Sequence, residues 1–206
     1  ARVHGRVQGV GFRPFVVQNA AALNLVGYVC NTSDGVVIEV EGPLATLDEF
    51  TERLRHRAPP LARVVEVETT EIPTTGESGF TIQSSRNTPG TSTLVPPDVA
   101  TCNDCLREVR DPNDRRCGYP FTNCTNCGPR WTIIGRIPYD RSHTSMASFT
   151  MCPACQAEYD NLQDRRFHAQ PNACPVCGPH VWLEGPLGAT NATGSVIEQA
   201  AEALAR

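Results

Sequence analysis

Hydrophobic and polar positions follow a regular pattern over the first 87 residues. Apolar side chains alternate with polar ones in short segments at 3–7, 26–30, 36–40, 65–67 and 80–82, and this period predicts β-strands. Apolar side chains at helical spacing predict a helix over 12–24, with Pro14 in its first turn. A second amphipathic helix is expected to begin at Pro43 and to run past Leu54. Ser33-Asp34-Gly35 is typical of a hairpin turn.

The order of these elements limits the architecture. It reads strand, helix, strand, strand, helix, strand, with one additional strand at the edge. Strands that have one apolar face need a cover, and two amphipathic helices can provide it. The pattern therefore predicts an α+β fold, a ferredoxin-like βαββαβ sandwich.

Two stretches of different composition divide the chain. Residues 84–97 and 184–195 are rich in Ser, Thr, Pro and Gly, and both are typical of linkers. A short amphipathic helix is expected after the second linker, where it would begin a further domain. We therefore expect three parts, which are a sandwich domain over 1–87, a cysteine-rich region over 88–183, and a linker with a helix over 184–206.

The 10 cysteines are distributed unevenly, because only Cys30 lies in the first half of the chain. Eight of the others form four C-x2-C pairs, and 18 residues separate the first pair from the second and the third from the fourth. The second set repeats the first at an offset of 50 positions, and Glu108 matches Glu158 at that offset. The runs 114–116 and 164–166 match as well. This region is therefore an internal duplication.

Metal binding is the chemistry that this spacing favours. Two thiolates of a C-x2-C pair hold one edge of a coordination tetrahedron, and a second pair closes the site. A disulfide framework is disfavoured because no secretion signal opens the chain, redox C-x2-C motifs usually occur singly, and iron–sulfur spacings differ. Four thiolates leave no open position, so we expect two structural zinc ions. The expected ligands are Cys102, Cys105, Cys124, Cys127, Cys152, Cys155, Cys174 and Cys177.

The equal gaps favour tandem fingers, in which each duplicated unit binds its own ion. A cross-braced arrangement, with the first pair joined to the third, stays open at this point. Cys117 has no partner and matches Phe167 in the repeat, so we expect it to be a buried or half-buried apolar substitute. Cys30 is expected in the core, and His168 is expected to have a packing role, with a functional surface role as the alternative.

Charge and composition exclude several functions. All 18 basic residues are Arg, and without Lys there is neither a Walker A phosphate loop nor Schiff-base chemistry. Residues 88–183 contain nine basic and nine acidic residues, so the cysteine-rich region lacks the positive surplus that nucleic-acid binding requires. No apolar run is long enough for a membrane span. Free thiolates for zinc indicate a reducing, cytoplasmic environment.

A glycine-containing turn joins the first strand to the first helix. Such a turn directs backbone N–H groups and the positive end of the helix dipole at one point, which makes an anion site. Arg13, in the first helical turn, can grip two phosphate oxygens with its guanidinium fork. The backbone N–H groups expected to bind phosphate belong to Gln8, Gly9, Val10, Gly11, Phe12 and Arg13.

The segment Val7-Gln8-Gly9-Val10-Gly11-Phe12-Arg13, followed by Asn31 18 positions after the arginine, resembles the acylphosphatase signature. The predicted order of strands and helices matches that family. An acylphosphatase-like domain followed by two C-x2-C-x18-C-x2-C units resembles the N-terminal part of the HypF family of carbamoyltransferases, which mature nickel–iron hydrogenases. The resemblance extends over essentially the whole chain.

This resemblance implies a function. HypF proteins convert carbamoyl phosphate and ATP into carbamoyl adenylate and pass the carbamoyl group to HypE, as the precursor of a cyanide ligand. The ATP-dependent domains would lie after residue 206. The part present here would hydrolyse carbamoyl phosphate or another acyl phosphate, with Arg13 on the phosphate and Asn31 on the attacking water. The alternative is a zinc-dependent protein-interaction module whose acylphosphatase-like domain is catalytically idle.

Overall fold

The computed structural model describes residues 1–76, 78–88, 93–185, 188–189 and 196–205. The middle of the first predicted linker, 89–92, and most of the second, 186–187 and 190–195, lie outside the described residues. No helix of the described part is both long and apolar enough to cross a membrane.

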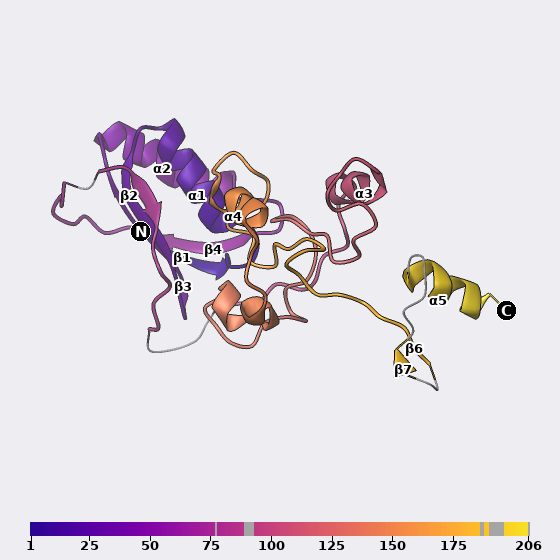
Figure 1. Cartoon of the computed structure of the whole chain (residues 1–206). Coiled ribbons are helices and arrows are strands. Elements are labelled where there is room, and N and C mark those ends of the chain that lie inside the picture. The colour runs from indigo at the N-terminus through magenta and orange to yellow at the C-terminus, as the bar shows by residue number, and fades with distance from the viewer. Residues whose placement is uncertain (77, 89–92, 186–187, 190–195, 206) are drawn as a thin grey trace.

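The first part of the chain is a five-stranded sheet with two helices on one face (Figure 1). The strand order is β4-β1-β3-β2-β5, and β5 pairs in parallel with β2 while the other neighbours are antiparallel. The sandwich predicted from the hydrophobic period is confirmed, including the additional edge strand, which is β5. The strands are β1 (Arg2–Arg6), β2 (Val26–Thr32), β3 (Gly35–Glu41), β4 (Arg63–Glu68) and β5 (Phe80–Ile82).

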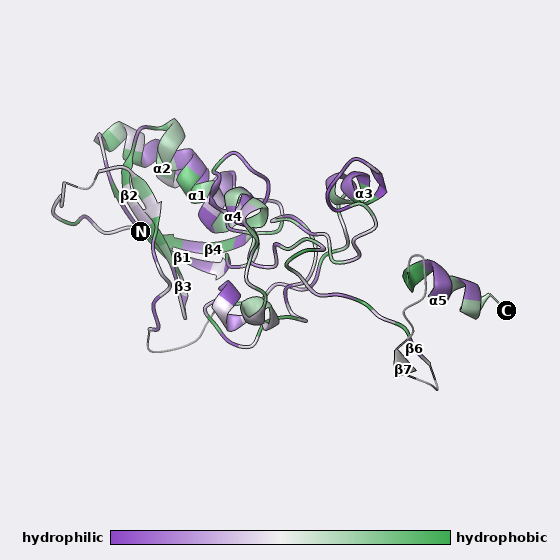
Figure 2. Cartoon of the chain, viewed as in Figure 1, coloured by the Kyte–Doolittle hydropathy of each residue, from purple (hydrophilic) through white to green (hydrophobic). Residues whose placement is uncertain are grey.

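The helices α1 (Phe12–Ala22) and α2 (Leu44–His56) cover this sheet. Pro43 is the N-cap of α2, one position before the helix begins, where its missing N–H leaves no donor unpaired. Apolar residues of the strands and of both helices form one buried cluster between the two layers, and green segments mark them in Figure 2. Members with no more than 1% exposure include Val3, Val16, Val29, Ile38, Phe50 and Leu54. Burial of this apolar surface stabilises the sandwich.

The cysteine-rich region contains two short helices that the sequence pattern did not indicate. They are α3 (Asn103–Arg110) and α4 (Pro153–Asp160), which occupy equivalent positions of the duplicated unit. Each begins directly after the first cysteine of its unit, because Cys102 and Cys152 are the N-caps. Two 3-10 turns, Arg141–His143 and Ser145–Ser148, lie in the connection between the units.

The last described residues form the small hairpin of β6 (Glu184–Gly185) and β7 (Gly188–Ala189) and then α5 (Val196–Leu204). The helix expected after the second linker is therefore present. In Figure 1 it lies away from the sheet and from the two units.

The expectation for Cys117 was wrong, because this side chain is exposed. Its repeat partner Phe167 is buried and packs against the apolar cluster of the sandwich, as does Leu162. Only the second unit presents this position to the sandwich domain, so only the second unit needs a large apolar residue there.

Candidate functional site

The turn between β1 and α1 has the backbone conformation of an anion site. Gly9 and Gly11 have positive φ angles of 67° and 74°, which residues with a Cβ rarely adopt. Gly11 is also the N-cap of α1, and it offers no side chain to cap the first amides of the helix. Backbone N–H groups and the positive end of the helix dipole therefore meet at this turn. We call residues 8–13 the cradle loop.

The Gln8 side chain holds the cradle loop in place. It is buried, and its Nε2 donates to the carbonyl oxygens of Thr32 at 2.7 Å and Gly35 at 2.8 Å. Both acceptors belong to the β2–β3 hairpin, so the loop is fixed to the strand that carries Asn31. The Gln8 side chain thus has a structural role, which the sequence pattern did not predict, in addition to the role expected of its backbone amide.

Arg13 and Asn31, which sequence analysis paired, lie close together in the structure. Arg13 Nη2 and Asn31 Nδ2 donate to the same acceptor, the carbonyl oxygen of Tyr139, each at 3.3 Å. Asn31 is 1% exposed, and its buried Oδ1 has no hydrogen-bond partner among the described residues. A buried carbonyl oxygen without a donor is uncommon and indicates a position for a bound donor such as water.

The cysteine-rich region supplies part of this site. Arg13 Nη1 forms an ion pair with Asp140 Oδ1 at 2.8 Å, and the Tyr139 N–H donates to Gln8 Oε1 at 2.8 Å. Burial raises the pKa of Tyr139 to about 12, so its phenol stays neutral. Sequence analysis missed both residues, since they lie more than 100 positions from Arg13 and belong to no periodic pattern or motif.

A second arginine lies beside the cradle loop, whereas the sequence had indicated Arg13 alone. Arg130 is 2% exposed, and its Nε donates to the carbonyl oxygen of Gly9. Its two terminal nitrogens donate to four carbonyl oxygens of the first unit. Because these donors are already used, Arg130 joins the cradle loop to the first unit.

Two spaces adjoin Arg13. A small cavity of about 30 Å³ lies over the cradle loop, and Arg130, Tyr139 and His168 line it. An open groove of about 650 Å³ lies on the other side and is lined by Asp140 and Tyr159, among others. Arg13 and His168 line both spaces. Burial, together with the charge of Arg13, lowers the pKa of His168 to about 4, so this ring is neutral near pH 7.

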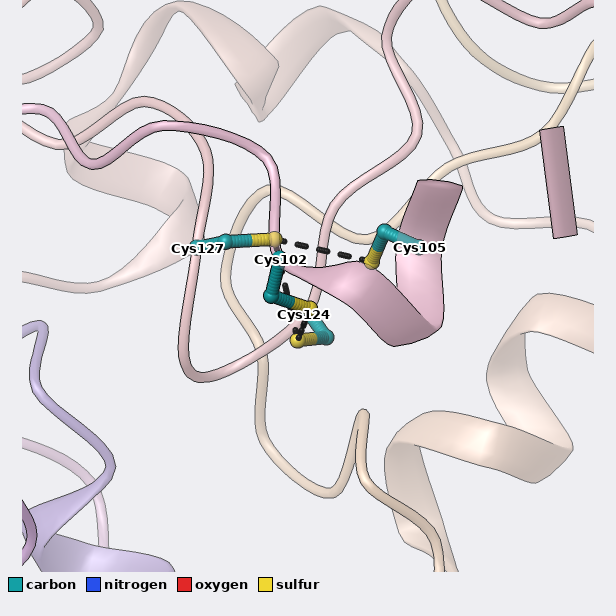
Figure 3. Close-up of side chains that lie close together, drawn as sticks. All are labelled: Cys102, Cys105, Cys124 and Cys127. Atoms are coloured by element: carbon teal, nitrogen blue, oxygen red, sulfur yellow. Dashed lines mark hydrogen bonds between the residues drawn. The ribbon is translucent and has the colours of Figure 1, made fainter. Parts of the chain in front are cut away.

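The eight paired cysteines form two clusters, and each cluster contains the four thiols of one unit. In the first, the sulfur atoms of Cys102 and Cys124 lie 3.8 Å apart, and those of Cys127 and Cys105 lie 3.5 Å apart (Figure 3). In the second cluster the neighbouring sulfur atoms are 3.6–3.8 Å apart. The grouping is the tandem one, and the cross-braced alternative does not occur.

These spacings fit zinc. Four sulfur atoms at about 2.3 Å from a central zinc ion form a tetrahedron with edges of about 3.8 Å. The observed separations of 3.5–3.8 Å agree with such edges. Each cluster could therefore hold one ion through thiolates alone.

The two units hold each other through reciprocal contacts. Arg115 Nη2 of the first unit lies 3.3 Å from Cys155 Sγ of the second. Its repeat partner Arg165 places Nη1 3.2 Å from Cys105 Sγ of the first unit. Guanidinium groups beside the clusters offset part of the negative charge that four thiolates leave on a zinc site. Each unit thus completes the surroundings of the other unit's cluster.

Two glutamates organise these arginines. Glu158 pairs with Arg115 and with Arg116, each at 2.6 Å, and Glu108 pairs with Arg165 and Arg166 in the equivalent way. Burial raises the pKa of Glu158, but hydrogen bonds from Arg116 and Arg115 outweigh this and lower the pKa to about 2. The carboxylate is therefore ionised, and the buried Arg116 guanidinium has a charged partner.

Comparisons with known proteins agree with this geometry. The acylphosphatase family model matches residues 1–82, and the HypF finger model matches 101–134 and 151–184. An acylphosphatase of Moorella thermoacetica is 50% identical over 84 residues, which are 40% of this chain and 89% of that protein. Residues 1–82 thus belong to the acylphosphatase family.

The whole chain matches one particular kind of protein. It is 53% identical to the carbamoyltransferase HypF of Rhodobacter capsulatus over 208 residues, which are 98% of this chain and 27% of that protein. A crystal structure of full-length HypF in a phosphate- and nucleotide-bound form superposes with a TM-score of 0.92 at 44% identity, over 99% of this chain and 26% of that one. The chain thus shares with the HypF-type carbamoyltransferases an acylphosphatase domain followed by two HypF finger units, and it spans about a quarter of the length of these relatives.

Proposed function

We propose that this chain hydrolyses acyl phosphates at the cradle loop, with Arg13 and Asn31 as the catalytic residues. The observation that carries the proposal is the buried Asn31 Oδ1, which lacks a donor among the described residues while the Arg13 guanidinium lies beside it. An amide oxygen next to a phosphate-binding cation is suited to hold the water that attacks phosphorus.

The reaction follows from these positions. The backbone amides of residues 8–13 and the Arg13 fork bind the phosphate and stabilise the charge that builds on its oxygens. Asn31 Oδ1 accepts a hydrogen bond from the water, whose oxygen forms the new bond to phosphorus. The bond between phosphorus and the bridging oxygen breaks, so inorganic phosphate and a carboxylate leave, and the released proton goes to solvent. A stable carboxylate leaving group makes a strong general base unnecessary.

We propose further that zinc occupies both cysteine clusters and has a structural role. The tetrahedral spacing of the sulfur atoms and the match to the HypF finger model support this assignment. In the longer protein, the substrate would be carbamoyl phosphate and the product carbamate. Further domains would activate the carbamate with ATP and transfer the carbamoyl group to HypE, as expected for the family.

The competing function is a zinc-dependent interaction module with an idle first domain. One observation favours it, because Tyr139 and Asp140 occupy the groups of Arg13 that would bind phosphate. A hydrolysis assay with acetyl phosphate and carbamoyl phosphate separates the two. We expect turnover by the chain and a loss of about 10³-fold in kcat/KM for Arg13→Ala. Equal rates for the variant and the parent would support the idle module instead.

A further inference from the structure

The catalytic arginine is occupied by the chain itself. Both terminal nitrogens of Arg13 are used, Nη1 by the Asp140 carboxylate at 2.8 Å and Nη2 by the Tyr139 carbonyl at 3.3 Å. A guanidinium fork grips phosphate or carboxylate with the same parallel N–H groups. Asp140 therefore takes the position on Arg13 that a substrate phosphate would need.

The space over the cradle loop is too small for a substrate in this arrangement. Its volume is about 30 Å³. One water needs roughly 10–15 Å³ by the same measure, so the cavity accepts no more than two or three waters. An acyl phosphate can bind there only after Tyr139 and Asp140 have moved.

The open groove shows from which side the substrate can arrive. Asp140 and Arg13 both line this groove, whereas the cradle loop glycines line only the small cavity. Asp140 thus lies on the groove side of Arg13, and Arg13 lines both spaces.

Its neighbour Arg141 is fixed to the cysteine-rich region. The Arg141 guanidinium donates to the carbonyl oxygens of Gln170, Asn172 and Phe149. The blocking carboxylate is therefore delivered by the finger units and not by the sandwich domain.

We propose that Asp140 is a built-in competing anion that closes the acyl phosphate site and sets its affinity for substrate. This inference rests on the proposed hydrolysis at Arg13 and Asn31. The phosphate arrives through the groove and replaces the carboxylate on Arg13. Asp140 then leaves the guanidinium, and the site opens toward the cradle loop.

The test compares Asp140→Asn and Asp140→Ala with the parent chain. Three quantities are measured, which are KM and kcat for acetyl phosphate and the Kd of inorganic phosphate, the last by calorimetry. Because Asn cannot form the ion pair, we expect KM and Kd to fall by roughly 3- to 10-fold in both variants, with kcat unchanged or higher. The matched control is Asp104→Asn, which removes a negative charge from an exposed helix position and should change neither KM nor Kd.

Two results would overturn the proposal. One is a lower kcat at unchanged KM and Kd, which would make Asp140 a positioning residue for Arg13. The other is no change in either constant in variants whose near-UV spectra match the parent. Phosphate binding keeps this test separate from the proposed function. Tighter phosphate binding by Asp140→Asn without any hydrolysis would support the competing anion and contradict the acylphosphatase activity.

Discussion

The sandwich domain and the cysteine-rich region reach stability by different means. The core of the sandwich consists of aliphatic and aromatic side chains, such as Val3, Ile38 and Phe50. In the cysteine-rich region, the largest fully buried side chains include Arg116 and Arg130. The apolar clusters of the cysteine-rich region are small, and one of them consists of the four cysteines of the first unit. The first part is held by apolar burial, and the second by thiolates and by hydrogen-bonded charge.

This difference determines how far the fold of each part depends on the cysteine clusters. A buried guanidinium is stable only while its acceptors stay in place, because an unpaired buried charge is costly. Most acceptors of Arg130 and Arg116 lie on the backbone around the cysteine clusters and on Glu158. We therefore expect the cysteine-rich region to depend on its ions, and the sandwich to be independent of them.

Removal of metal should produce the largest effect. Exhaustive chelation, or Cys105→Ser, is expected to unfold residues 93–183, since structural zinc sites contribute on the order of 10 kcal/mol to folding. Hydrogen exchange should show lost protection in that region, while β1 to β3 stay protected. Cys117→Ser is the matched control, because this exposed thiol belongs to neither cluster. An unchanged near-UV spectrum after chelation would contradict the account.

The next effect should come from the contacts between the units. Glu158→Gln removes the carboxylate from the buried Arg116, and we expect a loss of about 3 kcal/mol in the free energy of unfolding of this region. Because Arg115 also loses its partner beside Cys155, metal should leave the second cluster faster. Urea denaturation and a colorimetric metal-release assay measure the two effects.

An exposed pair of the sandwich domain gives the comparison. Glu52→Gln disrupts the ion pair with Arg55, in which the Glu52 side chain is 59% exposed and the Arg55 side chain 40%. It should change the free energy of unfolding by less than about 0.5 kcal/mol. Equal losses for Glu52→Gln and Glu158→Gln would show that the two parts of the molecule do not differ in this way.

An effect smaller than that of Glu158→Gln concerns pH. His168 has a pKa of about 4 in the folded chain against 6.5 for an unperturbed histidine, so the unfolded chain binds the proton first as the pH falls. Stability is therefore lost between pH 6.5 and 4, by about 1–2 kcal/mol at pH 5 for this half-buried ring. His168→Asn should weaken this dependence, and Asn tolerates the φ of 52° at this position. Denaturation curves at pH 7 and pH 5 give the loss in the free energy of unfolding between these two pH values. An equal loss for the parent and for His168→Asn would exclude His168 as the cause.

Much of the sandwich could be predicted from the sequence, because its strands and helices each bury one face and therefore show a period. The cradle loop and Arg13 were also accessible, since they form a short local motif, whereas Asn31 was accessible through the resemblance to acylphosphatases. The duplication favoured the tandem grouping of the cysteines but left the cross-braced one open. These features are encoded at short range or by repetition.

The remaining features depend on contacts between distant segments. Nothing near Asp140 or Tyr139 in the sequence indicates that they meet Arg13, because the connection between the units has no period and no motif. The short helices α3 and α4 have only eight residues each, which is too few to show a helical period in the sequence. The prediction for Cys117 was wrong because the two units are alike in sequence, but only in the second unit does this position pack on the sandwich.

Hydrolysis in water labelled with oxygen-18 tests the central claim most directly. If a water held by Asn31 attacks phosphorus, then acetyl phosphate turned over by the chain should yield inorganic phosphate that carries one labelled oxygen and acetate that carries none. Arg13→Ala and Asn31→Ala should form labelled phosphate only at the uncatalysed rate. Label in the acetate, or labelled phosphate formed equally fast by all three chains, would contradict the account.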